Sequence, residues 1–168
     1  MNNRREKSVL AIDPTSRGFG YAFFEGRLNL VDWGTKQVDV AENIRCIFQI
    51  REIIQRFQPD VITLEDPKGK GSRRCYRICK LIKFIRALAA KHRITTRCFS
   101  RDRVREIFAK FNARTKHQIA IEVSRQLPEL EPQLPRYRKP WMSEDERMSI
   151  FDAVSLALTF YSFSTPTK

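Results

Sequence analysis

The chain has 168 residues, and its 32 lysines and arginines outnumber its 19 acidic residues, which gives a formal net charge of +13. This length suits one compact domain over residues 1–168, and the charge is typical of a protein that binds a polyanion such as nucleic acid. The sequence lacks an apolar stretch long enough to span a membrane and a visible secretory signal, which argues against a membrane protein and predicts a cytoplasmic one.

The first part of the chain is rich in predicted strands. Isoleucines at three- and four-residue steps predict an amphipathic helix over residues 41–57, which ends before Pro59. Alternating or continuous apolar runs bounded by turn residues predict the strands. We expect these strands over residues 9–13, 20–24, 28–33 and 60–65, the middle two forming a hairpin.

Helices dominate the rest of the chain. A basic, glycine-containing segment, PKGKGSRR, precedes them. Ser143 with Glu146 has the pattern of a capping box, which predicts a last helix from there to about Phe163. The other expected elements are helices over residues 76–91, 101–109 and 115–127 and a strand over residues 94–99. Strands come first, and strands that alternate with helices follow. This order predicts an α/β domain with a mixed five-stranded central sheet flanked by helices, as in the RNase H-like fold.

Three carboxylates lie in otherwise apolar elements: Asp13 in VLAIDP, Glu65 at the end of DVITLE, and Asp152 in MSIFDAVSLALTFY. Side chains alternate along a strand, so Glu65 and not Asp66 is in phase with the buried residues of its strand. Burying an ionised carboxylate is costly unless a cation meets it. Together the three acids suit Mg²⁺, or Mn²⁺ in its place. The alternatives are an Asp-Pro turn for Asp13 and an arginine partner for Asp152.

The segment A-I-D-P-x-S-R-x-x-G-Y, residues 11–21, resembles the opening of the RuvC Holliday-junction resolvases. The resemblance continues at the strand ending in Glu65, at Thr115-Lys116-His117-Gln118-Ile119 and at Asp152-Ala153. It implies an RNase H-like fold, a homodimer, and two Mg²⁺ ions that are held by carboxylates and hydrolyse DNA phosphodiesters. Asp13, Glu65 and Asp152 carry over as ligands.

The sequence departs from that pattern one helical turn before Asp152, where Ser149 replaces an acid or a histidine. Asp145 lies seven residues before Asp152, so on a continuous helix both would face the same way and Asp145 could be the missing metal ligand. The alternative is an acid that only complements the helix dipole. Lys116 is a candidate for neutralising the scissile phosphate, with a solvated surface lysine as the alternative.

Two groups of basic residues are candidates for nucleic-acid binding. The first follows Glu65 and comprises Lys68, Lys70, Arg73, Arg74, Arg77 and Lys80. The second comprises Arg136, Arg138 and Lys139, which surround Tyr137 and Trp141 and with them could clamp a strand by charge and stacking. Alternatively, Trp141 packs against the last helix. The loop after Glu65 lacks the aromatic wedge that such resolvases commonly present, and Tyr76 is its nearest aromatic residue.

The sequence therefore predicts a Mg²⁺-dependent endodeoxyribonuclease that acts at four-way junctions or other branched DNA. One alternative is an RNA-processing nuclease of the YqgF type, which shares the fold. The other is a non-catalytic nucleic-acid-binding module that has lost a metal ligand at Ser149.

Overall fold

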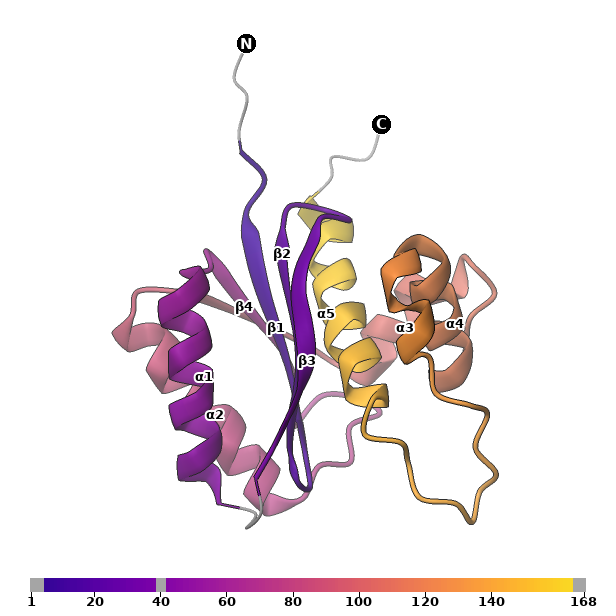
Figure 1. Cartoon of the computed structure of the whole chain (residues 1–168), viewed down its shortest axis with the longest axis horizontal. Coiled ribbons are helices and arrows are strands. Elements are labelled where there is room, and N and C mark those ends of the chain that lie inside the picture. Colours follow the sequence, from indigo (N-terminus) through magenta and orange to yellow (C-terminus); the bar gives the residue numbers. More distant parts are fainter. Residues whose placement is uncertain (1–4, 39–41, 165–168) are drawn as a thin grey trace.

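The computed structural model describes residues 5–38 and 42–164 and contains one five-stranded sheet (Figure 1). The strands run in the spatial order β3-β2-β1-β4-β5, with β1 antiparallel to β2 and parallel to β4. This confirms the predicted mixed sheet. The strands are β1 (Ser8–Thr15), β2 (Gly18–Glu25), β3 (Leu30–Gln37), β4 (Val61–Glu65) and β5 (Thr95–Phe99).

The helices divide between the two faces of the sheet, so that β1 is buried on both sides (Figure 1). Helices α1 (Asn43–Phe57) and α2 (Tyr76–Lys91) cover one face, and their apolar sides form a core with Leu10 and Ile12 of β1. The last helix, α5 (Met148–Ser164), lies on the other face. The remaining helices, beyond α5, are α3 (Arg101–Ala109), α4 (Lys116–Gln126) and the short 3-10 helix η1 (Pro128–Gln133).

Helices α3 and α4, which both reach the site, begin at or within one residue of their predicted starts at residues 101 and 115. Ser100 caps α3 by accepting a hydrogen bond from the backbone of Arg103, and Thr115 forms a complete capping box with Gln118 at α4. Helix α1 begins at Asn43, and the predicted start at Ala41 lies outside the described residues.

The predicted start of the last helix is wrong. Helix α5 begins at Met148, and the expected capping box at Ser143 does not form, because residues 143–147 are irregular or turn. The side chain of Asp145 accepts a hydrogen bond from the backbone N–H of Arg147 at 2.9 Å. Such an Asx turn competes with helix formation, so the helix begins only after Arg147. Asp145 therefore lies before α5 and is not in helical phase with Asp152.

None of the helices within residues 5–38 and 42–164 has both the length and the apolar character needed to cross a membrane.

Candidate functional site

The three predicted carboxylates converge where β1, β4 and α5 meet. Asp13 and Glu65 lie near the carboxyl ends of adjacent parallel strands and share the sheet face on which Val9 and Val61 pack into the core beneath α5. Each is only 3% exposed, and Asp152 on α5 is 9% exposed. The choice of Glu65 agrees with the structure, because Asp66 instead accepts a hydrogen bond from the backbone of Lys68 at 3.0 Å.

Gly20 allows α5 to approach the sheet at this point. It pairs with Asp13 across the β1–β2 hairpin, and a Cβ atom placed on it would lie 2.4 Å from the carbonyl carbon of Ser149. Any larger residue would push the start of α5 away from β1. The missing side chain thus helps to set the separation of Asp152 from Asp13.

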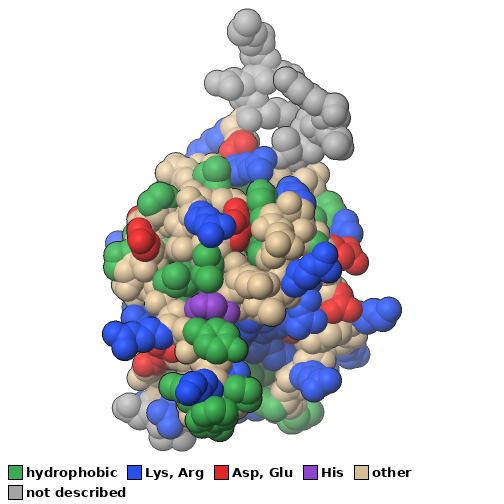
Figure 2. Space-filling model, turned by 90° about the vertical axis from the view of Figure 1, so that its right-hand side faces the viewer, with side chains coloured by type: hydrophobic (Ala, Val, Ile, Leu, Met, Phe, Trp, Pro, Cys, Tyr) green, Lys and Arg blue, Asp and Glu red, His purple; other side chains and the backbone are tan. Residues whose placement is uncertain are grey.

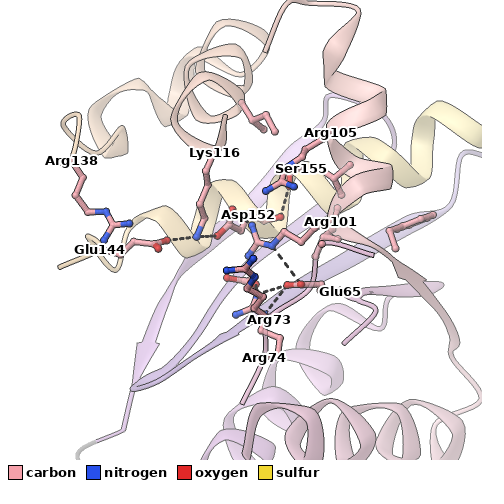
Figure 3. Close-up of a pocket in the computed structure, with 16 residues that line it drawn as sticks. Glu65, Arg73, Arg74, Arg101, Arg105, Lys116, Arg138, Glu144, Asp152 and Ser155 are labelled. Carbon is pink, nitrogen blue, oxygen red and sulfur yellow. Dashed lines mark hydrogen bonds and ion pairs between the residues drawn. The ribbon is translucent and has the colours of Figure 1, made fainter. Parts of the chain in front are cut away.

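Arg74, at the end of the basic loop after β4, joins the two strand carboxylates. Figure 3 shows it beside Glu65. Its Nη2 atom lies 2.5 Å from Asp13 Oδ1 and 2.5 Å from Glu65 Oε2, and its Nη1 donates to the carbonyl of Pro14 at 3.0 Å. Ser72, from the same loop, donates a 2.5 Å hydrogen bond to Glu65. A positive group therefore already lies between Asp13 and Glu65.

Two further basic residues surround Asp152. Nη1 of Arg101, at the start of α3, lies 3.6 Å from one oxygen of Asp152, and Nε of Arg101 lies 3.4 Å from Glu65. Nζ of Lys116, at the start of α4, lies 2.8 Å from the other oxygen of Asp152. Lys116 also pairs with Glu144, which belongs to the segment before α5. Lys116, the candidate for neutralising the scissile phosphate, thus lies beside Asp152.

The charges of the three carboxylates are thus matched by three cations. Burial and, to a smaller extent, the neighbouring Asp152 raise the pKa of Asp13 to about 7, although Arg74 opposes the shift. Burial also acts to raise the pKa of Glu65, but Arg74, Arg101 and Ser72 together hold it below its usual value. Burial would lower the pKa of Lys116, yet Asp152 raises it. Of Asp13 and Glu65, Asp13 is therefore the more easily protonated.

The carboxylates line a hollow of about 610 Å³ whose rim is basic (Figure 3). Within the described part of the chain, no three His, Cys, Asp or Glu side chains are already drawn together as a metal site. The donor set nevertheless suits a hard divalent cation, since carboxylate oxygens are the ligands that Mg²⁺ prefers. A cation coordinated by both Asp13 and Glu65 would take the place of Nη2 of Arg74, so the residues fit a metal once this arginine moves away.

Asp145 and Ser149 do not join the carboxylate cluster. The Asp145 carboxylate forms an ion pair with the Arg147 guanidinium at 2.6 Å, in addition to its bond with the Arg147 backbone. Hydrogen bonding to Arg147 holds the pKa of Asp145 below its usual value. The hydroxyl of Ser149 donates to the carbonyl of Glu146 at 2.6 Å. Asp145 lines the adjacent hollow that also includes Asp13, but its oxygens already serve the turn.

Two of the predicted nucleic-acid-binding residues have partners within the protein in this structure. Arg74 holds the carboxylates, and Arg77 donates to the carbonyl of Thr15 at 2.7 Å and to Asn43 at 3.0 Å, which ties α2 to β1 and α1. Helix α2 begins at Tyr76, so Arg73 lies in the loop before it, and Arg77 and Lys80 lie on the helix. The remaining predicted residues lie at least partly at the surface: Lys68, Lys70, Arg73, Lys80, Arg136, Arg138 and Lys139.

Three members of the site were not predicted from the sequence: Arg101, Ser72 and Glu144. Arg101 had a usable signal, because it follows the strand that pairs in parallel with β4, with Phe99 opposite Glu65. The carboxyl ends of neighbouring parallel strands meet at one edge of a sheet, where ligand sites form. Ser72 and Glu144 lie in irregular segments and gave no such signal.

Comparisons with known proteins place this fold. No protein-family model and no curated protein matches the sequence. Thermus thermophilus RuvC in complex with a Holliday junction substrate is similar in structure, with 19% identity, a TM-score of 0.69, and coverage of 97% of this chain and 99% of that one. The yeast mitochondrial Holliday junction resolvase Ydc2 has 15% identity and a TM-score of 0.65 over 93% of this chain and 78% of its own.

A fowlpox virus resolvase in complex with Holliday junction DNA is also similar, with 16% identity, a TM-score of 0.55, and coverage of 92% of this chain and 99% of that one. At these identities the likeness establishes the fold. The chain therefore has the RNase H-like fold that these resolvases share, as the order of its strands and helices predicted.

Proposed function

We propose that this chain, folded like the resolvases, is a Mg²⁺-dependent endonuclease that hydrolyses DNA phosphodiesters. The observation that carries the proposal is the convergence of Asp13, Glu65 and Asp152, from β1, β4 and α5, on one hollow with a basic rim. A phosphate group entering this hollow meets positive charge first, and the buried carboxylates lie behind it. Such an arrangement suits both a phosphodiester and the cation that activates it.

The residues of the hollow divide the work between them. Asp13 and Glu65 would hold magnesium from the sheet, and Asp152 would hold it from α5. When bound, Mg²⁺ supplies a water of lowered pKa and stabilises the leaving 3′ oxygen. Lys116 and Arg101 lie beside Asp152 and are placed to neutralise the phosphate. Arg74, once released from Asp13 and Glu65, is free to pair with a phosphate oxygen.

The natural substrate that we favour is a four-way junction or another branched DNA. The support is the fold, which the solved resolvases with Holliday junction DNA share. Cleavage of labelled four-way junctions, flaps, linear duplexes and structured RNA, each with Mg²⁺ and with EDTA, tests this choice. Preferred cleavage of structured RNA would instead favour the YqgF-type alternative. The homodimer implied by the resemblance stays a prediction, which analytical sedimentation tests. The use of Mn²⁺ in place of Mg²⁺ also stays a prediction, which cleavage assays with each metal test.

A second candidate is a non-catalytic nucleic-acid-binding module. The specific observation in its favour is that Arg74, Arg101 and Lys116 already neutralise the three carboxylates. Buried acids with such partners are tolerated without a metal. The absence of Mg²⁺-dependent cleavage on every substrate of the panel, together with tight DNA binding, would establish this candidate.

The basic loop after β4 gives a prediction about affinity. Replacing Lys68, Lys70 and Arg73 together by alanine removes three positive charges at the surface and leaves the partly buried Arg74 in place. We expect weaker DNA binding and a salt dependence whose slope falls by about 0.9 for each phosphate that the loop no longer neutralises. Binding measured at several salt concentrations gives the slope. The same slope in the triple variant and the unmodified chain would place the DNA on another surface.

The fourth-ligand question gives a prediction about the metal requirement. Because the Asp145 carboxylate is bound by Arg147, and Ser149 by the Glu146 carbonyl, neither is expected to reach the metal. Asp145→Ala and Ser149→Ala should therefore leave the Mg²⁺ concentration for half-maximal cleavage unchanged. Titrating both variants beside the unmodified chain measures this. A higher Mg²⁺ requirement for Asp145→Ala alone would show that the segment before α5 rearranges to supply a ligand.

A further inference from the structure

The segment between η1 and α5, residues 134–147, carries two aromatic side chains exposed to solvent. Trp141 is 78% exposed and Tyr137 is 72% exposed. The alternative that Trp141 packs against the last helix is therefore wrong. On the face that carries this segment, hydrophobic and basic side chains gather together toward its lower end (Figure 2). Tyrosine and tryptophan are enriched at binding interfaces, because each offers an apolar ring together with a polar group.

A tight turn holds Trp141 away from the protein. The backbone N–H of Met142 donates to the carbonyl of Lys139 at 3.0 Å, so that Pro140 and Trp141 occupy the two central positions. Proline in the first of these fixes the backbone angle that the turn needs. The guanidinium of Arg138 closes the turn by donating to the carbonyl of Met142 at 2.7 Å. The indole is thus presented on a preorganised support.

Basic groups accompany both rings. Nζ of Lys139 lies 5.3 Å from the centre of the Trp141 ring, and Arg136 and Arg138 are exposed beside Tyr137. The Tyr137 ring is held on its other side by an edge-to-face contact with His117 of α4, with ring centres 5.6 Å apart. Cations interleaved with exposed aromatic rings bind a flexible polyanion that also offers flat apolar groups, which describes a single strand of nucleic acid.

The segment is also attached to the carboxylate hollow. Glu144 pairs with Lys116, which in turn pairs with Asp152, and Arg138 lines the same hollow as the three acids (Figure 3). The aromatic pair and the proposed cleavage site are therefore fixed relative to one another through α4 and α5. A strand whose phosphate enters the hollow would pass along this segment.

From this geometry we propose that Trp141 and Tyr137 form a stacking site for unpaired bases next to the cleaved phosphodiester. The location beside a cleaved bond depends on the proposed nuclease function, whereas the stacking does not. The basic loop after β4 contains no aromatic residue itself, and Tyr76, the first residue of α2, is 81% exposed beside it. The turn at Trp141 supplies a second exposed aromatic group from another part of the chain. The ligand class is single-stranded nucleic acid, or the unpaired bases of a branched one.

Trp141 offers a direct test, since the chain contains only one other tryptophan, Trp33. In a Trp33→Phe background and in EDTA, an oligothymidine of roughly 12 nucleotides is expected to quench the Trp141 emission. An abasic strand of the same length carries the same phosphates and should not quench it. Equal quenching by the two strands would overturn the proposal. Oligouridine in a parallel titration shows whether RNA is bound as well as DNA.

The affinity of variants for the same oligothymidine gives the second readout. Trp141→Ala should weaken binding roughly 5- to 150-fold, the range for loss of one stacked base, while Trp141→Phe should keep most of it. Affinity for a fully paired duplex should hardly change, because its bases are already stacked on each other. Unchanged binding of the single strand by Trp141→Ala, or an equal loss for the duplex, would contradict a stacking role.

Phe48→Ala is the matched control. Phe48 lies on α1 across the sheet, is 54% exposed, and has the Arg51 guanidinium 5.3 Å from its ring centre, as Trp141 has Lys139. Its replacement should leave single-strand binding unchanged. The experiments in EDTA involve no cleavage, so a protein that stacks bases but never cleaves would refute the nuclease and keep the stacking site. Cleavage by the unmodified chain, together with equal single-strand affinity of Trp141→Ala and the unmodified chain, would refute the stacking site and keep the nuclease.

Discussion

Replacing Asp13 by asparagine is expected to reduce the rate of Mg²⁺-dependent cleavage by more than about 100-fold. Losing a residue that only hydrogen-bonds to a metal ligand typically lowers metal affinity or activity 10- to 100-fold, and Asp13 is proposed as a ligand itself. In the proposed site, Asp13 and Glu65 would hold the cation at the position that Nη2 of Arg74 occupies. Asparagine has nearly the same shape but lacks the charge. Cleavage of a labelled four-way junction, measured under single-turnover conditions against Mg²⁺ concentration, gives the effect.

The same variant should fold and bind DNA, because the exposed basic residues are untouched and Arg74 keeps its hydrogen bond with Glu65. Asp66→Asn is the matched control, since this neighbouring acid serves a turn with Lys68 and faces away from the cluster. It should cleave normally. Cleavage by Asp13→Asn at the rate of the unmodified chain would remove Asp13 from the proposed site and favour the non-catalytic candidate.

Replacing Arg74 by alanine is expected to destabilise the protein strongly in EDTA. The change leaves Asp13 and Glu65 buried without their common partner, and breaking a buried ion pair in this way costs about 3–5 kcal/mol. In a chain of this length such a loss lowers Tm by roughly 6–20 °C. Added Mg²⁺ should restore much of this stability, because in Arg74→Ala it no longer competes with the guanidinium for the two carboxylates.

Thermal melts with EDTA and with Mg²⁺ measure both effects. Arg73→Ala is the control, because Arg73 is the neighbour of Arg74 in the same loop and lies nearer the surface. Its Tm should change little in either condition. Equal stabilisation of Arg74→Ala and the unmodified chain by Mg²⁺ would show that the cation does not bind at the position that Arg74 holds.

Some members of the site follow from short-range patterns. Asp13 and Glu65 each end a short apolar strand, and the two-residue alternation of a strand distinguishes Glu65 from Asp66 without any tertiary information. Asp152 interrupts an apolar helix. These signals depend only on the local cost of placing a charge among apolar residues, which is why a single sequence carries them.

Other predictions failed where local chemistry competes with periodicity. The spacing of Asp145 and Asp152 suits a helix, but the Asp145 side chain binds the backbone of Arg147 and the helix starts later. Arg77 looked like a member of a basic surface and instead satisfies carbonyl and amide groups between elements. A hydrogen bond formed inside a turn or between elements leaves no periodic trace in the sequence.

By itself, the sequence determined the mixed sheet, its order of strands and helices, and the three carboxylates, because patterns of burial repeat every two or about 3.6 residues along the chain. Only the tertiary structure decided which cations meet those carboxylates. Arg74 reaches Asp13 across 61 positions of the chain, and Lys116 reaches Asp152 from another helix. With 32 basic residues to choose from, composition cannot select these partners. The selection comes from the packing of α3, α4 and the basic loop around the ends of β1 and β4, which brings distant side chains within ion-pair distance.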